Sequence, residues 1–124
     1  MKLRIEGNSL RLRLSDLEVQ QLASDGTLSS KVSFPKGKAL YYIINTHSGR
    51  SFEASLQNDG IRISIPNNLC QRWAHSEQIG LKGSCLVDDG VELSILVEKD
   101  LGCRHQEDDE GKVIQRGIRD TSTV

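Results

Sequence analysis

Residues 2–14 read KLRIEGNSLRLRL, and the rest of the chain is organised around this stretch. Apolar and charged residues alternate on both sides of Gly7, Asn8 and Ser9, which is the period-two pattern of strands with one buried face. Gly and Asn tolerate the positive φ values of tight turns. The stretch therefore predicts a β-hairpin that has leucine and isoleucine on one face and basic residues on the other.

The segments that follow predict further strands and two short helices. Ser15 with Glu18 is typical of a capping box, in which each side chain bonds the other's free backbone N–H, so a helix is expected to about Ser24. A second helix is expected from Pro66 to about His75. Alternation and turn motifs predict strands at 27–34, 39–45, 52–57, 61–65, 79–86 and 91–98. The second of these segments is apolar on both faces and is expected to be the most buried strand.

The two halves of the chain show the same pattern when one is slid by 51 residues without a gap. Turns then fall on turns and apolar residues on apolar residues, for example Leu12 on Ile63. This indicates an internal duplication with repeats at about 1–47 and 52–98. The predicted fold is α+β, with about eight mostly antiparallel strands and two short helices in two pseudo-symmetric ββαββ units. The strands are expected to form either a barrel-like structure or two packed sheets.

Composition narrows the class of protein. A chain of 124 residues suits one domain, expected at 1–103 and followed by a polar tail at 104–124. Sixteen basic and seventeen acidic residues nearly cancel, and only 4% of residues are aromatic, so nucleic acid is not an expected partner. No apolar run reaches the roughly 20 residues of a membrane helix. Three cysteines without a CxxC motif indicate reduced thiols and a cytoplasmic location.

The basic face of the first hairpin is the first candidate site. Its members are Lys2, Arg4, Arg11 and Arg13, with Arg62 as a further candidate. Side chains on one face of paired strands lie about 5 Å apart, so their guanidinium groups are placed to bind phosphate or carboxylate. The structural alternative is a solvated face on which these residues pair, at small net gain, with Glu6, Glu53 or Glu98.

A second candidate lies near the end of the chain. Cys103 and His105 are followed by an acidic run at 107–110, and all of these residue types bind metals. Two ligands do not make a zinc site, and no second pair occurs, so a free thiol before an acidic tail is the alternative. Motifs for nucleophilic or phosphate-loop catalysis are also missing. No catalytic residue is assigned and no cofactor is expected.

The opening MKLRIEGNSLRLRLS and the later ILVEKDLGC resemble a family of small bacterial proteins of unknown function. The family pattern begins MK-x-R-I-x-G-N-S-x-R-L-R-L and ends L-V-E-K-D-F-x-C, and this chain departs from it at Leu101. The resemblance carries over Arg4, Gly7, Asn8, Ser9, Arg11, Arg13, Glu98, Lys99, Asp100 and Cys103. It implies that Glu98 and Lys99 join the arginines as ligand-binding residues, and it supplies no activity.

The sequence thus predicts a small binding domain that recognises an anionic small molecule or a protein partner through the arginine-bearing hairpin. It predicts no membrane association. One alternative is a metal- or thiol-dependent enzyme that uses Cys103 and His105. Another is a structural or assembly module that pairs through a sheet edge.

Overall fold

The computed structural model describes residues 1–101, which fold into eight β-strands, two α-helices and one 3₁₀ turn. The strands are β1 (Lys2–Glu6), β2 (Ser9–Leu14), β3 (Thr27–Ser33), β4 (Ala39–His47), β5 (Glu53–Gln57), β6 (Gly60–Pro66), β7 (Gly80–Leu86) and β8 (Glu92–Lys99). The helices are α1 (Asp16–Asp25) and α2 (Asn67–Ala74), and the 3₁₀ turn is η1 (Pro35–Gly37). The predicted strands and helices are all present, with ends close to those expected.

The strands form two four-stranded sheets of equivalent topology. The order is β1-β2-β8-β7 in sheet A and β5-β6-β4-β3 in sheet B. Each sheet consists of two antiparallel hairpins joined by a central parallel pair, β2 with β8 and β4 with β6. The predominance of antiparallel pairing was expected from the tight turns, but the two parallel pairs were not. Sheet A thus brings together the first and last hairpins of residues 1–101.

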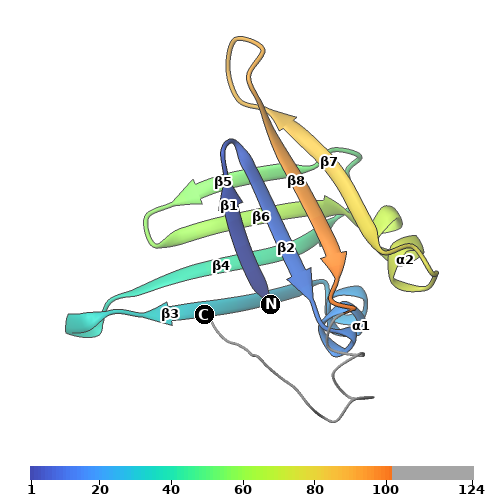
Figure 1. Ribbon diagram of the computed structural model, residues 1–124, viewed down its shortest axis with the longest axis horizontal. Coiled ribbons are helices and arrows are strands. Elements are labelled where there is room, and N and C mark those ends of the chain that lie inside the picture. Colours follow the sequence, from blue (N-terminus) through green and yellow to red (C-terminus); the bar gives the residue numbers. More distant parts are fainter. Residues whose placement is uncertain (102–124) are drawn as a thin grey trace.

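The two sheets pack face to face, and the strands of sheet A cross those of sheet B steeply (Figure 1). Both helices lie together at one end of this pair, where the Gln71 amide donates to the Ala23 carbonyl at 2.7 Å. The core consists of apolar side chains from both sheets and both helices: Leu10, Leu12, Leu14, Val19, Leu22, Leu28, Ile44, Phe52, Ile63, Ile65, Cys70, Trp73, Ala74, Leu81, Ile95 and Val97. The architecture is therefore two packed sheets and not a closed barrel.

The start of α1 redirects the chain from one sheet to the other. The Ser15 hydroxyl accepts from the Glu18 backbone N–H at 3.3 Å, and the Glu18 carboxylate accepts from the Ser15 N–H at 2.9 Å. This is the predicted capping box, which satisfies two backbone donors that the first helical turn leaves unpaired. Gly26 ends the helix at φ 81°, a left-handed conformation that favours glycine, and β3 then begins in sheet B.

Strand β4 is less buried than its apolar sequence predicts. Only Ile44 is fully buried, whereas Leu40 and Tyr41 remain 41% and 36% exposed. The pairing of β4 with β6 begins at Tyr41, so the start of β4 pairs with β3 alone and projects from the sheet as a two-stranded ribbon. The expectation that 39–45 is the most buried strand was wrong, because side chains on this ribbon have no second sheet to cover them.

The two halves of the structure superpose in register only when a gap is allowed. The first hairpins correspond through the predicted shift of 51 residues, which places Leu12 on Ile63. The second hairpins correspond through a shift of 53, from the Leu28–Ile44 pair to the Leu81–Val97 pair. The segment between the start of the helix and the next strand is two residues longer in the second half of the chain (67–79) than in the first half (16–26). Because this difference is even, the ungapped comparison still assigned each side chain to the correct face.

Candidate functional site

The basic residues of the first hairpin lie on the outward face of sheet A. Pairing of β1 with β2 sets Arg4 opposite Arg11 and Lys2 opposite Arg13. The parallel pairing of β2 with β8 then sets Glu98 beside Arg13. We call this surface the arginine face and define it by five residues: Lys2, Arg4, Arg11, Arg13 and Glu98. The hairpin supplies its cations, but the carboxylate comes from the far end of the described chain.

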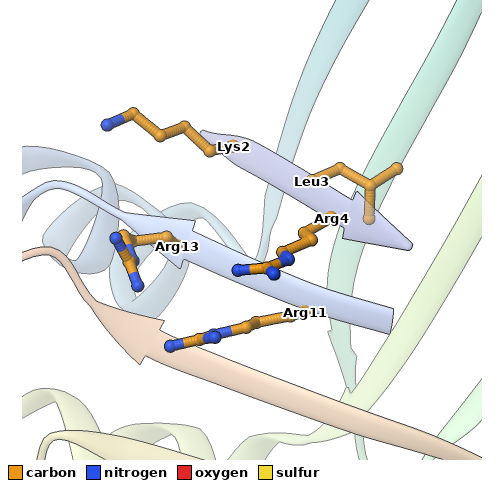
Figure 2. Close-up of a pocket in the computed structure, with 5 residues that line it drawn as sticks. All are labelled: Lys2, Leu3, Arg4, Arg11 and Arg13. Atoms are coloured by element: carbon orange, nitrogen blue, oxygen red, sulfur yellow. The ribbon is translucent and has the colours of Figure 1, made fainter. Parts of the chain in front are cut away.

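Three guanidinium groups gather on this face. Figure 2 shows Arg4, Arg11 and Arg13 extending over the sheet with their guanidinium groups in one region, while the Lys2 ammonium points away from them. A shallow pocket of about 190 Å³ lies here and is lined by these four residues and Leu3. Arginine is strongly suited to such a place because its guanidinium is always charged and presents donors in a planar fork.

Glu98 holds two of the three arginines. Its Oε1 atom accepts from Arg11 Nε at 2.8 Å and lies 2.7 Å from Arg11 Nη2, and it accepts from Arg13 Nε and Nη2 at 3.2 and 3.0 Å. Both arginines thus turn the same edge, formed by Nε and Nη2, toward one oxygen. The Nη1 side of each guanidinium is not used in these contacts and remains available to a ligand.

The two arginines also set the charge state of Glu98. The Glu98 side chain is only 14% exposed, and this burial by itself raises the pKa of the carboxyl. Hydrogen bonds from Arg11 and Arg13, together with their positive charges, more than offset burial, so the pKa lies below the ordinary carboxyl value. Glu98 is therefore ionised at neutral pH and acts as a fixed acceptor between the two guanidinium groups.

Other carboxylates reduce the excess of positive charge. Arg4 Nη2 lies 3.4 Å from Glu6 Oε1, and Lys2 Nζ lies 3.4 Å from Asp100 Oδ2. The Arg4 and Lys2 side chains are 63% and 73% exposed, so water screens both pairs and each contributes little to stability. Such contacts are readily exchanged for a ligand, because an exposed cation loses little when it changes partner.

Sheet B carries the same arrangement without the concentration of charge. Asn45 of β4 occupies the place that Glu98 has on β8, and its Oδ1 accepts from Arg62 Nη1 at 2.9 Å and from Ser64 Oγ at 3.3 Å. On β5, the edge strand of sheet B, Glu53 and Ser55 occupy the positions that Lys2 and Arg4 occupy on β1 of sheet A. The two networks occupy equivalent positions, so the same strand arrangement also forms with an amide and a hydroxyl in place of the carboxylate and Arg13.

The structure separates some residues that the sequence grouped together. Arg62 lies on sheet B and does not reach the arginine face. Lys99 follows Glu98 on the strand and points the other way, so its ammonium donates to the Ser76 carbonyl at 2.8 Å and lies 5.7 Å from the centre of the Trp73 ring. Arg4, Arg11, Arg13 and Glu98 are therefore together, as the hypothesis requires, and Lys99 is apart from them.

The second candidate site falls entirely outside the described part of the chain. Cys103 and His105 lie outside residues 1–101, so their metal-binding and catalytic roles stay predictions. Within those residues, no group of three or more His, Cys, Asp or Glu side chains is placed to hold a metal ion. Cys70 is a buried free thiol, and burial raises its pKa to about 11, which keeps it protonated and unreactive.

The sequence interpretation missed one further cation on this outward face, Lys82. It pairs with Leu96 of β8, which in turn pairs with Arg11 of β2, so a single row of residues crosses all four strands of sheet A. Nothing in the local sequence of β7 indicates this neighbour. Only the parallel pairing of β2 with β8 brings Lys82 near the first hairpin.

The sequence model of one protein family matches residues 1–114. The chain belongs to DUF7009, a family of unknown function. The match agrees with the resemblance seen in the opening and closing motifs, and it extends beyond Cys103 into the segment expected to form a tail. Searches of curated proteins and of solved structures find no match.

The described helices also bear on the question of a membrane. Neither α1 nor α2, the two α-helices of residues 1–101, is long and apolar enough to cross a bilayer.

Proposed function

We propose that this protein is a binding domain that recognises an anionic group through the arginine face. The observation that carries the proposal is the convergence of Arg4, Arg11 and Arg13 on one pocket, with two of them oriented by Glu98. A pocket of about 190 Å³ suits a small anionic head group better than a whole metabolite. The Nη1 sides of the two oriented guanidinium groups supply donors for it, and Arg4 supplies a third set.

Comparison of the two sheets supports a role beyond folding. In sheet B, one arginine and one hydroxyl donate to the acceptor on the neighbouring strand, Asn45. An acceptor at this position therefore does not need three arginines. Sheet A instead places three guanidinium groups where sheet B has one. The equivalent topology of the halves supports an internal duplication, after which one copy of the face acquired or kept its charge. We place this domain in the cytoplasm, an inference supported by the free thiols of Cys70 and Cys85 in the described part of the chain.

The test is isothermal titration calorimetry at low ionic strength with inorganic phosphate, sulfate and acetate. The informative variant is Arg4→Gln, because Arg4 makes no contact with Glu98 and its exposed side chain leaves the fold intact. The matched control is Arg62→Gln on sheet B, which changes the net charge of the protein by the same amount. We expect Arg4→Gln to weaken phosphate binding by about tenfold, since it removes one charge-assisted contact.

The control variant should bind phosphate as the wild type does. Equal weakening in Arg62→Gln would mean that overall charge, and not the arginine face, attracts the anion. A wild-type protein that binds none of the three anions at low salt refutes the proposed function outright.

A further inference from the structure

A second pocket continues from the first across sheet A. It has a volume of about 250 Å³ and shares Arg4 and Arg11 with the arginine pocket. Its remaining lining comes from all four strands of sheet A, from β1 to β7: Glu6, Ser9, Leu10, Lys82, Ser94, Ile95 and Leu96. The two pockets therefore form one elongated depression, with the Arg4–Arg11 pair in the middle and a different cation at each end.

The strand pairing gives the dimensions of this depression. Arg4, Arg11, Leu96 and Lys82 are paired one after another on β1, β2, β8 and β7. Neighbouring strands lie about 4.8 Å apart, so two strand spacings place Lys82 about 10 Å from Arg11. Leu96 is the apolar position between the two cations, and Ser9 and Ser94 border it on the next row.

Lys82 differs from the other cations of this surface in having no partner in the described chain. Arg11 and Arg13 pair with Glu98, Arg4 pairs with Glu6, and Lys2 pairs with Asp100. The exposed Lys82 ammonium forms no ion pair or hydrogen bond with any of residues 1–101. A charged ammonium at the end of a pocket is the simplest receptor for a second negative group, since it needs no fixed orientation.

We propose that the ligand of the arginine face is a small molecule with two phosphate groups about 10 Å apart. One phosphate lies on Arg4, Arg11 and Arg13, the second lies on Lys82, and the uncharged body crosses Leu96. A tetrahedral phosphate presents several oxygens to three guanidinium groups, whereas a planar carboxylate is matched by one fork. This proposal rests on the anion-binding function proposed above and names the class of ligand.

The lining also argues against a nucleic acid. Neither pocket is lined by an aromatic side chain, so a base has no ring on which to stack. A flexible polyphosphate strand gains its affinity along many contacts, whereas the cations here occupy two short neighbouring rows on a single sheet. The body of the ligand is therefore expected to be aliphatic or a sugar, in contact with leucine and serine.

The experiment compares three probes by calorimetry: inorganic phosphate, fructose monophosphate and fructose bisphosphate. The variant is Lys82→Gln, and the matched control is Lys31→Gln, which removes an exposed lysine from β3 in sheet B. We expect the bisphosphate to bind the wild type about tenfold more tightly than the monophosphate, because it adds one charge-assisted contact. Lys82→Gln should abolish this advantage and leave the affinity for inorganic phosphate unchanged, and Lys31→Gln should alter neither.

The outcomes of this experiment distinguish failure of the two-phosphate proposal from failure of the proposed anion-binding function. If inorganic phosphate binds but the bisphosphate gains nothing, or if Lys82→Gln keeps the full advantage, the two-phosphate ligand is refuted and the anion site stands. If none of the three probes binds, the proposed function itself fails. A short single-stranded oligodeoxynucleotide that binds more tightly than the bisphosphate, with an affinity lowered by Lys82→Gln, overturns the small-molecule proposal in favour of a nucleic acid.

Discussion

Replacement of Glu98 by Gln tests how the arginine face is held together. The substitution keeps the shape of the side chain but removes the charge that lies between Arg11 and Arg13. The amide oxygen can take the place of Oε1 and still accept from both arginines, but these hydrogen bonds are weaker without the negative charge. The variant therefore loses two ion pairs and keeps weaker, uncharged hydrogen bonds in their place.

The expected loss of unfolding free energy depends on how exposed the Glu98 ion pairs are. Hydrogen bonds to charged groups contribute about 1.5–3 kcal/mol when buried, whereas exposed ion pairs contribute about 0.2–1 kcal/mol. The Arg11 and Arg13 side chains are 38% and 41% exposed, so the lower range applies to each pair. For the two pairs together, we expect Glu98→Gln to lower the free energy of unfolding by about 0.4–2 kcal/mol at pH 7.

The pH dependence gives the sharper test. The folded-state pKa of Glu98 is depressed below 4.5, so its contribution to stability is present above the unfolded-state pKa and is lost as pH falls through the folded-state pKa. The difference between wild type and variant should therefore be constant near neutral pH and shrink in acid. Other carboxylates with depressed pKa values, such as Glu18, are present in both proteins and cancel in the comparison.

The assay is urea denaturation followed by the fluorescence of Trp73, the only tryptophan in the chain and fully buried in the core. The matched control is Glu53→Gln on the edge strand of sheet B, whose exposed carboxylate accepts from Ser51 Oγ. This control should change the free energy of unfolding by less than about 0.5 kcal/mol. A Glu98→Gln effect of the same size at pH 3 and pH 7 would show that charge is not its source and refute the reasoning.

Three further predictions concern the fold. Ser15→Ala removes the helix N-cap and should cost about 1 kcal/mol in urea denaturation, with no effect on phosphate binding. Gly60→Ala should destabilise the protein by more than about 2 kcal/mol, because the added Cβ would lie 1.8 Å from the Tyr41 carbonyl oxygen. In Gly7→Ala the added Cβ meets no atom, so this variant should cost only about 1 kcal/mol, which is the strain of its positive φ. The Cys70 thiol should resist Ellman's reagent at pH 8 until urea unfolds the protein, and rapid labelling of Cys70 in the native state would contradict its burial.

Local features of this fold were predictable because they depend on near neighbours in the sequence. Alternation around residues 7–9 predicted the first hairpin, and the Ser15–Glu18 spacing predicted the capping box. The apolar face of the first hairpin was also correct, because side chains on a strand alternate strictly. These signals reach over a few residues, so they indicate which elements form and not which elements become neighbours.

The composition of the arginine face needed the tertiary structure. The hairpin by itself indicated Arg4, Arg11 and Arg13. The sequence also offered Glu98 as a cross-strand partner of these residues, and the pairing is confirmed for Arg11 and Arg13. Lys99 is separated from Glu98 by the alternation of side chains along β8, which extends one residue beyond the expected strand. The position of Lys82 was not predictable, since it depends on the parallel pairing of β2 with β8. That pairing joins strands about 85 residues apart, and no local pattern encodes a contact at such a distance.

The stretch at 2–14 by itself determined a hairpin with a basic outward face and an apolar inward face. The fold then decided what that face is next to. Burial of the leucines against sheet B orients the hairpin, and pairing with β8 supplies the carboxylate that holds Arg11 and Arg13. The physical reason is that the pattern of one strand specifies its own two faces, whereas the neighbours of a strand are chosen by the free energy of packing the whole core.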